Sequence, residues 1–170
     1  MEAKPELKYI FQNVSDWLKF AEAKHAGLIV FNAGTIIGIL SSYSSIHSFL
    51  SKVPVCISLA CFGISILLSL FSQVPVTSNR FFNQKEIGDV NLYFFGHLCH
   101  INDKTFISEF VKISPNFSAT QLDNQLINQI LVNARITQAK YTFYKFASYI
   151  TAFAAGFLGL TTMMKILWHC

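Results

Sequence analysis

Three long runs without a charged side chain constrain this sequence more than any other feature. Residues 25–51, 53–79 and 146–164 contain no Asp, Glu, Lys or Arg. A helix needs about 20 mostly apolar residues to cross a hydrocarbon core about 30 Å thick, and all three runs allow that length, the third only just. One Lys or Asp at the centre of such a helix would cost roughly 2.5–3.5 kcal/mol. The runs therefore predict three transmembrane helices and argue against buried helices of a water-soluble bundle.

The rest of the sequence fits an all-α membrane protein with a polar part between the second and third spans. Hydrophobic residues make up 52% of the chain and charged residues 13%. We expect an amphipathic helix over residues 1–24 and a transmembrane hairpin over 25–79, with spans at about 26–45 and 54–74. A small helical cytoplasmic region over 80–145 and a third span over 146–168 complete the prediction. Because the first run follows a long amphipathic stretch, we expect an anchor that is retained and not a signal peptide.

The distribution of basic residues predicts the orientation. Eleven of the 13 Lys and Arg residues precede the first span or lie between the second and third. The positive-inside rule then places the N-terminus and residues 80–145 in the cytoplasm and the C-terminus outside. The same bias explains the net charge of +4, so no nucleic acid partner is expected.

The N-terminal stretch has one apolar stripe at helical spacing. Pro5 suits the first turn of such a helix. The stripe either lies in the headgroup plane or packs against the rest of the cytoplasmic part, and we favour packing because charges of both signs flank it. The stripe consists of Leu7, Ile10, Phe11, Val14, Trp17, Leu18 and Ala21.

The middle region predicts two further helices. Asn102 or Asp103 can cap a short helix with an apolar face made of Phe106, Ile107, Phe110 and Val111. Farther on, Ser118 and Gln121 match a capping box, and Phe117 with Leu122 matches its hydrophobic staple. No Gly or Pro follows until Gly156. We therefore expect one continuous helix from Ala119 into the third span, about 70 Å long at 1.5 Å per residue.

Small residues recur at helical spacing inside the spans. Gly34 and Gly38 form a GxxxG pattern, and Gly156 lies in a similar pattern in the third span. Such residues let helices approach closely in lipid, within one chain or between chains, although a polar pore lining is the alternative. Asn32, a polar residue well inside a span, is expected to mark a helix–helix contact.

Catalytic and metal-binding signatures are missing from the sequence. There is no P-loop, HExxH or GxSxG motif, and the nine acidic residues are scattered. The nearest approach to a metal site is "GHLCH", with His97, Cys99 and His100, which lacks a fourth ligand for zinc. The four cysteines form no CxxC pair. We expect no enzyme activity, no cofactor, no metal and no disulfide framework.

Several short motifs occur in the order and spacing of a known family. "WLKFAEAKHAGLIVFNAGTIIGIL" opens the first span, and "NLYFFGHLCHI" follows two close spans. "INQILVNARITQAKYTFYKFASYI" leads into the last span. Over roughly residues 15–165 the chain resembles the membrane effectors of bacterial Pycsar anti-phage systems. The matching features are the Ala21–Lys24 entry, Asn32 with Gly34, Phe95 with Gly96, and Lys140 with Tyr141. The chain departs from the pattern at Glu22, where we expect Asp, and at His97.

The resemblance implies a function. Such effectors act with a cyclase that makes a cyclic pyrimidine mononucleotide, cyclic UMP or cyclic CMP, on infection. The messenger activates the effector at the bacterial inner membrane, and loss of membrane integrity stops phage spread by abortive infection. Homo-oligomers are expected, in contact with membrane lipid. A cyclic monophosphate needs cations for its anion and an aromatic wall for its base. The candidate ligand-binding residues are Lys24, Arg135, Lys140, Tyr141, Phe95 and Gly96.

Two other functions are alternatives, and the residues fit the first of them better than the second. A passive scaffold or accessory subunit of a membrane complex would explain the same cations as membrane-flanking charges. A small transporter is disfavoured, because the sequence has neither inverted repeats nor ionisable groups at mid-membrane.

Overall fold

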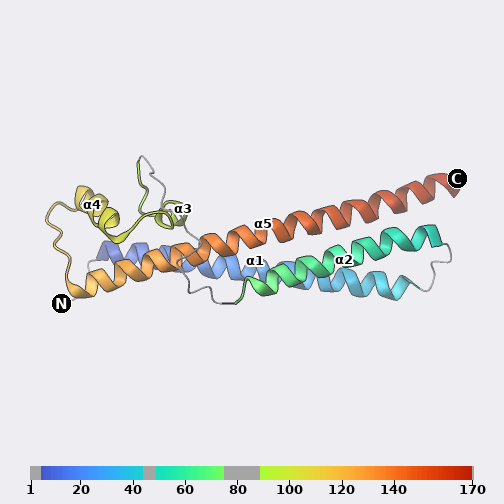
Figure 1. Ribbon diagram of the computed structural model, residues 1–170, viewed down its shortest axis with the longest axis horizontal. Helices are drawn as coiled ribbons and strands as arrows, with labels where there is room; N and C mark the ends of the chain where they lie inside the picture. Colours follow the sequence, from blue (N-terminus) through green and yellow to red (C-terminus); the bar gives the residue numbers. More distant parts are fainter. Residues whose placement is uncertain (1–4, 44–48, 75–88, 170) are drawn as a thin grey trace. The chain divides into compact units, whose positions relative to one another are not determined.

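Every element of the described chain is an α-helix. The computed structural model describes residues 5–43, 49–74 and 89–169 (Figure 1). Its elements are α1 (Pro5–Tyr43), α2 (Phe49–Phe71), α3 (Phe95–Leu98), α4 (Asp103–Ile113) and α5 (Gln121–His169). Three of them, α1, α2 and α5, are long and apolar enough to cross a membrane. The predicted all-α fold with three such helices is therefore confirmed, as is the continuity of α5.

The chain divides into two units. The first unit contains Met1–Glu22 and Pro75–Tyr141, and the second contains Ala23–Val74 and Thr142–Cys170. Helices α1 and α5 each contribute residues to both units.

The first unit has an apolar core to which all of its helices contribute. The predicted stripe of α1 packs into this core, so the packing alternative is the correct one, although Trp17 at its edge is 37% exposed. Helices α3 and α4 lie beside the N-terminal half of α5 (Figure 1). The largest fully buried side chains of this core are Leu7, Ile10, Val14, Leu92, Leu98, Phe106, Phe110, Ile127, Ile130 and Leu131.

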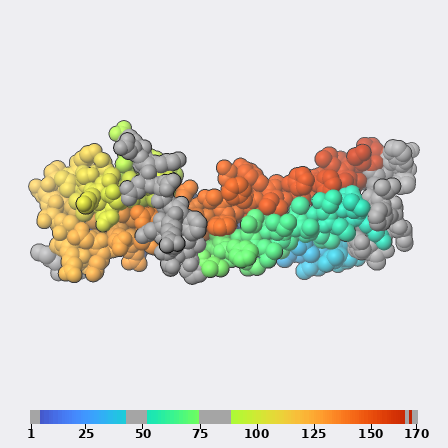
Figure 2. All heavy atoms as spheres, in the orientation of Figure 1, coloured from blue at the N-terminus to red at the C-terminus, as the bar shows by residue number. Residues whose placement is uncertain are grey.

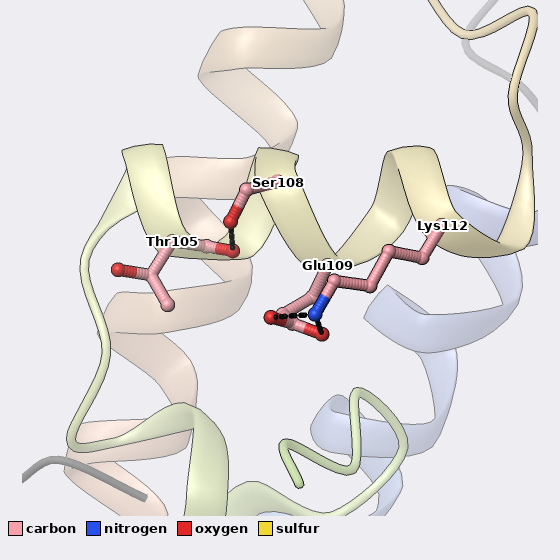
Figure 3. A network of polar contacts seen from close by, with 4 residues as sticks. All are labelled: Thr105, Ser108, Glu109 and Lys112. Carbon is pink, nitrogen blue, oxygen red and sulfur yellow. Dashed lines mark hydrogen bonds and ion pairs between the residues drawn. The ribbon is translucent and has the colours of Figure 1, made fainter. Parts of the chain in front are cut away.

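Helix α4 begins where the sequence predicts. The Asn102 side chain accepts a hydrogen bond from the Thr105 backbone N–H at 2.8 Å and so caps the helix. Phe106 and Phe110 are buried on one face. An ion pair within α4 flanks that face, and in it Lys112 Nζ lies 2.7 Å from Glu109 Oε1 (Figure 3). Figure 3 also shows Ser108 donating to the Thr105 carbonyl, so the polar side of α4 is satisfied locally.

The predicted start of α5 is wrong by two residues. The helix begins at Gln121, and the capping box joins Thr120 and Asp123 instead of Ser118 and Gln121. The Thr120 N–H donates to Asp123 Oδ2 at 3.0 Å, and the Asp123 N–H donates to Thr120 Oγ1 at 3.2 Å. A carboxylate is a stronger acceptor than the glutamine amide, which favours this register.

The predicted staple is also wrong. Phe117 is buried against the Phe110 ring, with centroids 4.7 Å apart, whereas Leu122 is 48% exposed. Tertiary packing of Phe117 on α4 therefore replaces the local contact with Leu122.

In the second unit α1, α2 and α5 pack along one another, and α2 lies beside α5 in Figure 2. Their outer surface is apolar on every helix. Its large exposed side chains are Val30, Phe31, Ile37, Leu40, Val53, Ile57, Ile64, Leu67, Leu70, Phe71, Val74, Phe146, Tyr149, Phe153, Leu160, Met163, Met164 and Leu167.

Candidate functional site

Three aromatic rings meet in the first unit from distant parts of the chain. The Phe95 ring at the start of α3 stacks on the Tyr141 ring of α5, with centroids 5.2 Å apart and planes 18° apart. The Trp17 ring of α1 lies 5.6 Å from Phe95 and 6.3 Å from Tyr141. Phe95 is buried and Trp17 is partly open to solvent. The cluster therefore has a buried ring in Phe95, a partly buried one in Tyr141 and its most accessible ring in Trp17, and we call Trp17, Phe95 and Tyr141 the aromatic cluster.

A buried cation accompanies the aromatic cluster. Lys140 precedes Tyr141 on α5, and its Nζ lies 3.2 Å from Glu22 Oε1 of α1. The Lys140 side chain is 9% exposed, whereas that of Glu22 is 48% exposed. A buried charge needs a partner because desolvation is expensive, and Glu22 supplies it here. The pairing was not predicted from sequence, where the two residues are far apart.

Gly96 has a packing role. A Cβ added at this position would lie 2.5 Å from Cε1 of the Phe94 ring. Phe94 in turn packs on Phe95, with ring centroids 5.1 Å apart. The absence of a side chain at Gly96 therefore lets the Phe94 ring fold over α3 next to the aromatic cluster.

Arg135 performs a different task. Its Nη2 donates to the Ile101 carbonyl at 3.2 Å, which ties α5 to the segment just before α4. Nearby Cys99 is buried and donates to the Gly96 carbonyl at 3.3 Å. Burial raises the pKa of the Cys99 thiol to about 11, so the group stays protonated and unreactive at neutral pH.

The structure groups only some of the predicted ligand-binding residues. Phe95 and Tyr141 are in contact, Lys140 adjoins Tyr141 on α5, and Gly96 adjoins Phe95 on α3. Lys24 belongs to the second unit, where its Nζ lies 5.5 Å from the centre of the Tyr144 ring. The residues that sequence reasoning missed as part of this site are Trp17 and Glu22.

The second unit contains a hydrogen-bonded junction between its three helices. Asn32 of α1 donates to Ser65 Oγ of α2 at 2.9 Å, and Thr151 Oγ1 of α5 donates to Asn32 Oδ1 at 3.1 Å. Ser65 donates onward to the Ala147 carbonyl of α5 at 2.9 Å. All three side chains are buried. Asn32 therefore lies at a helix–helix contact, as its position in a span suggested.

Further buried polar contacts are made by Ser58 of α2 and by Ser72, the residue that follows α2. Ser58 donates to the Ala154 carbonyl at 3.3 Å, and Ser72 Oγ lies 2.9 Å from His25 Nε2. The spacing of the serines on α2 could have shown this polar face. We call the whole set the polar seam, and it consists of His25, Asn32, Ser58, Ser65, Ser72 and Thr151.

The glycines predicted to pack do not do so within this chain. Gly34, Gly38 and Gly156 are exposed, and a Cβ added at any of them meets no atom within 4 Å. The within-chain version of that prediction is wrong, because the polar seam and not the glycine face lies between the helices. Contact between two copies through these glycines stays a prediction.

Together, an apolar exterior and a hydrogen-bonded polar interior define the class of protein. Lipid cannot hydrogen-bond, so polar side chains in a membrane turn inward and apolar side chains face outward. The second unit has this arrangement on three helices of sufficient length, which makes the chain a helical membrane protein.

The family follows from a comparison with known families. The model of the Pycsar effector protein domain, PycTM, matches residues 6–167, and the chain belongs to this family. No curated protein and no solved structure matched the chain. Its role is accordingly that of an effector in Pycsar anti-phage defence, which implies a partner cyclase system.

Proposed function

We propose that this effector is switched on by a cyclic pyrimidine mononucleotide, cyclic UMP or cyclic CMP, and then impairs the integrity of the bacterial inner membrane. The proposal depends chiefly on one observation, the family match that extends over residues 6–167 and so includes both units. Cell death on infection would then prevent phage spread. The partner cyclase supplies the messenger, and the effector itself needs no catalytic site.

The first unit supplies the chemistry that this messenger requires. The aromatic cluster offers ring surface to a pyrimidine base, and Lys140 offers a cation to the cyclic phosphate. In this proposal residues 80–145 and the N-terminus face the cytoplasm, where the messenger is made, and the C-terminus faces outward. The eleven basic residues that flank the spans on that side support the orientation.

The second unit supplies the membrane part of the proposal. Its exposed side chains are apolar, so the unit can reside in lipid while the messenger is absent. Shifting a two-state population from 1:99 to 99:1 takes about 5.5 kcal/mol of differential binding. Binding of one mononucleotide to one chain seldom supplies this much differential binding free energy, so we propose that several copies act together as a homo-oligomer.

The test is expression in bacteria with and without the partner cyclase, followed by a membrane-potential dye. We expect depolarisation only when effector and active cyclase are both present. An inactive cyclase variant is the matched control. Depolarisation by the effector alone, or none with the messenger present, would contradict the proposal and favour a passive scaffold.

A further inference from the structure

The proposal concerns the ion pair between Lys140 and Glu22, and it rests on the proposed function. We propose that Lys140 is the receptor for the messenger's phosphate and that Glu22 is a built-in competitor, which occupies the cation until the phosphodiester displaces it. The pyrimidine base would stack on the accessible Trp17 ring of the aromatic cluster.

The asymmetry of the ion pair supports an exchange of partners. Lys140 precedes Tyr141 of the aromatic cluster on α5, and its side chain is only 9% exposed, so its ammonium group has little access to water. Glu22 is half exposed and regains hydration when it leaves. An incoming phosphodiester therefore replaces a carboxylate that loses little by departing, while the buried cation keeps an anionic partner throughout.

The geometry fits one ligand that bridges both parts of the site. Trp17 and Glu22 are five residues apart on α1, about 7.5 Å along the helix axis and about 140° around it, so the link between them runs through α5. Trp17 contacts Tyr141, the residue that follows Lys140. A base on Trp17 and a phosphate on Lys140 would thus occupy neighbouring positions along one α1–α5 contact.

The exchange would also alter the link between two long helices. Glu22 belongs to α1 (Pro5–Tyr43) and Lys140 to α5 (Gln121–His169), and both helices continue into apolar sequence. The messenger would break the direct ion pair between them and substitute its own contacts. Glu22 would then inhibit activation until the messenger displaces it from Lys140.

Nucleotide binding by the full chain tests the proposal. The purified protein in phosphatidylcholine nanodiscs is titrated with cyclic UMP and with cyclic CMP by calorimetry. Glu22→Gln removes the competitor and should bind the preferred nucleotide about two- to fivefold more tightly. Lys140→Gln should bind about tenfold more weakly or worse, and Trp17→Ala about fivefold more weakly or worse. Adding Glu22→Gln to Lys140→Gln should change nothing further, because the competition needs the cation.

The chain offers a matched control in another ion pair of the first unit, between Glu109 and Lys112. Glu109→Gln and Lys112→Gln remove charges of the same kind from α4, where the Lys112 side chain is 69% exposed and the Glu109 side chain 22% (Figure 3). Both should bind like the original chain. If Glu109→Gln tightens binding as much as Glu22→Gln does, the effect is one of net charge and the proposal is overturned.

The remaining outcomes separate this inference from the proposed function. If the original chain binds the nucleotide and both Glu22→Gln and Lys140→Gln bind it with the same affinity, the inference is overturned and the proposed function stands. Absence of binding for both nucleotides would overturn the two together. If Lys140→Gln does not fold, Glu22→Gln decides the matter, since it leaves the buried cation in place.

A lipid headgroup also carries a phosphodiester and could bind the same cation. A second binding experiment distinguishes the lipid from the nucleotide. Nanodiscs containing phosphatidylglycerol should give the same nucleotide affinity at matched ionic strength. A loss of affinity that disappears in Lys140→Gln would assign the cation to lipid and overturn the proposal.

Discussion

The two units place their polar groups in opposite ways. The first unit buries apolar side chains from every helix, and its buried polar groups are mostly satisfied nearby, as Thr137 is by the Asn133 carbonyl one turn away. In the second unit the buried polar groups connect different helices, and the large apolar side chains lie outside. The first unit therefore has the side-chain distribution of a protein in water, and the second unit that of a protein in lipid. Burying apolar surface is favourable only where the surroundings are water.

The largest expected effect comes from removing the same side chain in the two units. Phe110→Ala deletes a fully buried ring of the first unit and should lower its free energy of unfolding by about 3–5 kcal/mol. Phe153→Ala removes a ring that is 59% exposed in the second unit, where lipid replaces it, and should change stability by less than about 0.5 kcal/mol. Thermal unfolding in nanodiscs measures both. Equal losses would remove the contrast between the units.

The next effect concerns α5, which contributes to both units. Ala139→Pro removes a backbone hydrogen bond within the helix and should destabilise it by about 3 kcal/mol or more. We expect depolarisation in the presence of cyclase to be abolished while the protein still fractionates with membranes. Ala139→Ser, which keeps the backbone donor, serves as the control. Depolarisation that survives the proline would show that continuity of α5 is dispensable.

A smaller effect is expected in the polar seam. Asn32→Val removes bonds to Ser65 and Thr151, whose hydroxyls lie 2.8 Å apart and can still bond each other. Cross-helix hydrogen bonds in membranes contribute about 0.6 kcal/mol on average and up to about 1.7 kcal/mol. Thr35→Val is the control, because the Thr35 hydroxyl donates to the Phe31 carbonyl of its own helix and, among the described residues, to no other helix. Unfolding by denaturing detergent should separate the two variants, and equal stabilities would argue against the seam as a cross-helix link.

The smallest effect on single-chain stability is expected at the exposed glycines. A Cβ at Gly34 or Gly38 meets no atom within 4 Å, so Gly34→Leu combined with Gly38→Leu should leave thermal stability within about 0.5 kcal/mol. If these glycines contact a second copy, cross-linking in membranes should show fewer oligomers. An unchanged oligomer would exclude this face as an interface.

The sequence predicts the long helices well because their causes are local. Charge-free runs and the absence of breakers before Gly156 suffice for the three apolar helices and for an uninterrupted α5. The start of α5 was misassigned because Ser118 with Gln121 and Thr120 with Asp123 both fit a capping pattern. Burial of Phe117 against α4 accompanies the second register, and no local rule contains that contact.

The sites were harder to predict because their contacts are distant in sequence. Lys140 and Tyr141 were singled out as one motif, but the partnership with Glu22 and the contact with Trp17 depend on how α1 packs on α5. Ser58 and Ser65 of α2 lie seven residues apart, a spacing that indicates one helix face but not its partner. Their hydrogen bonds to Ala147 and Ala154 become visible only when α2 lies beside α5.

Accessibility of spin labels in the full chain tests the contrast between the units most directly. Labels are introduced through Leu67→Cys and Phe153→Cys in the second unit and Lys112→Cys in the first, with the four native cysteines replaced by alanine. We predict that oxygen, which partitions into lipid, relaxes the labels at 67 and 153 more strongly than a water-soluble nickel chelate does, and that the order is reversed at 112. Strong relaxation by the nickel chelate at 67 and 153 would contradict a membrane location for the second unit.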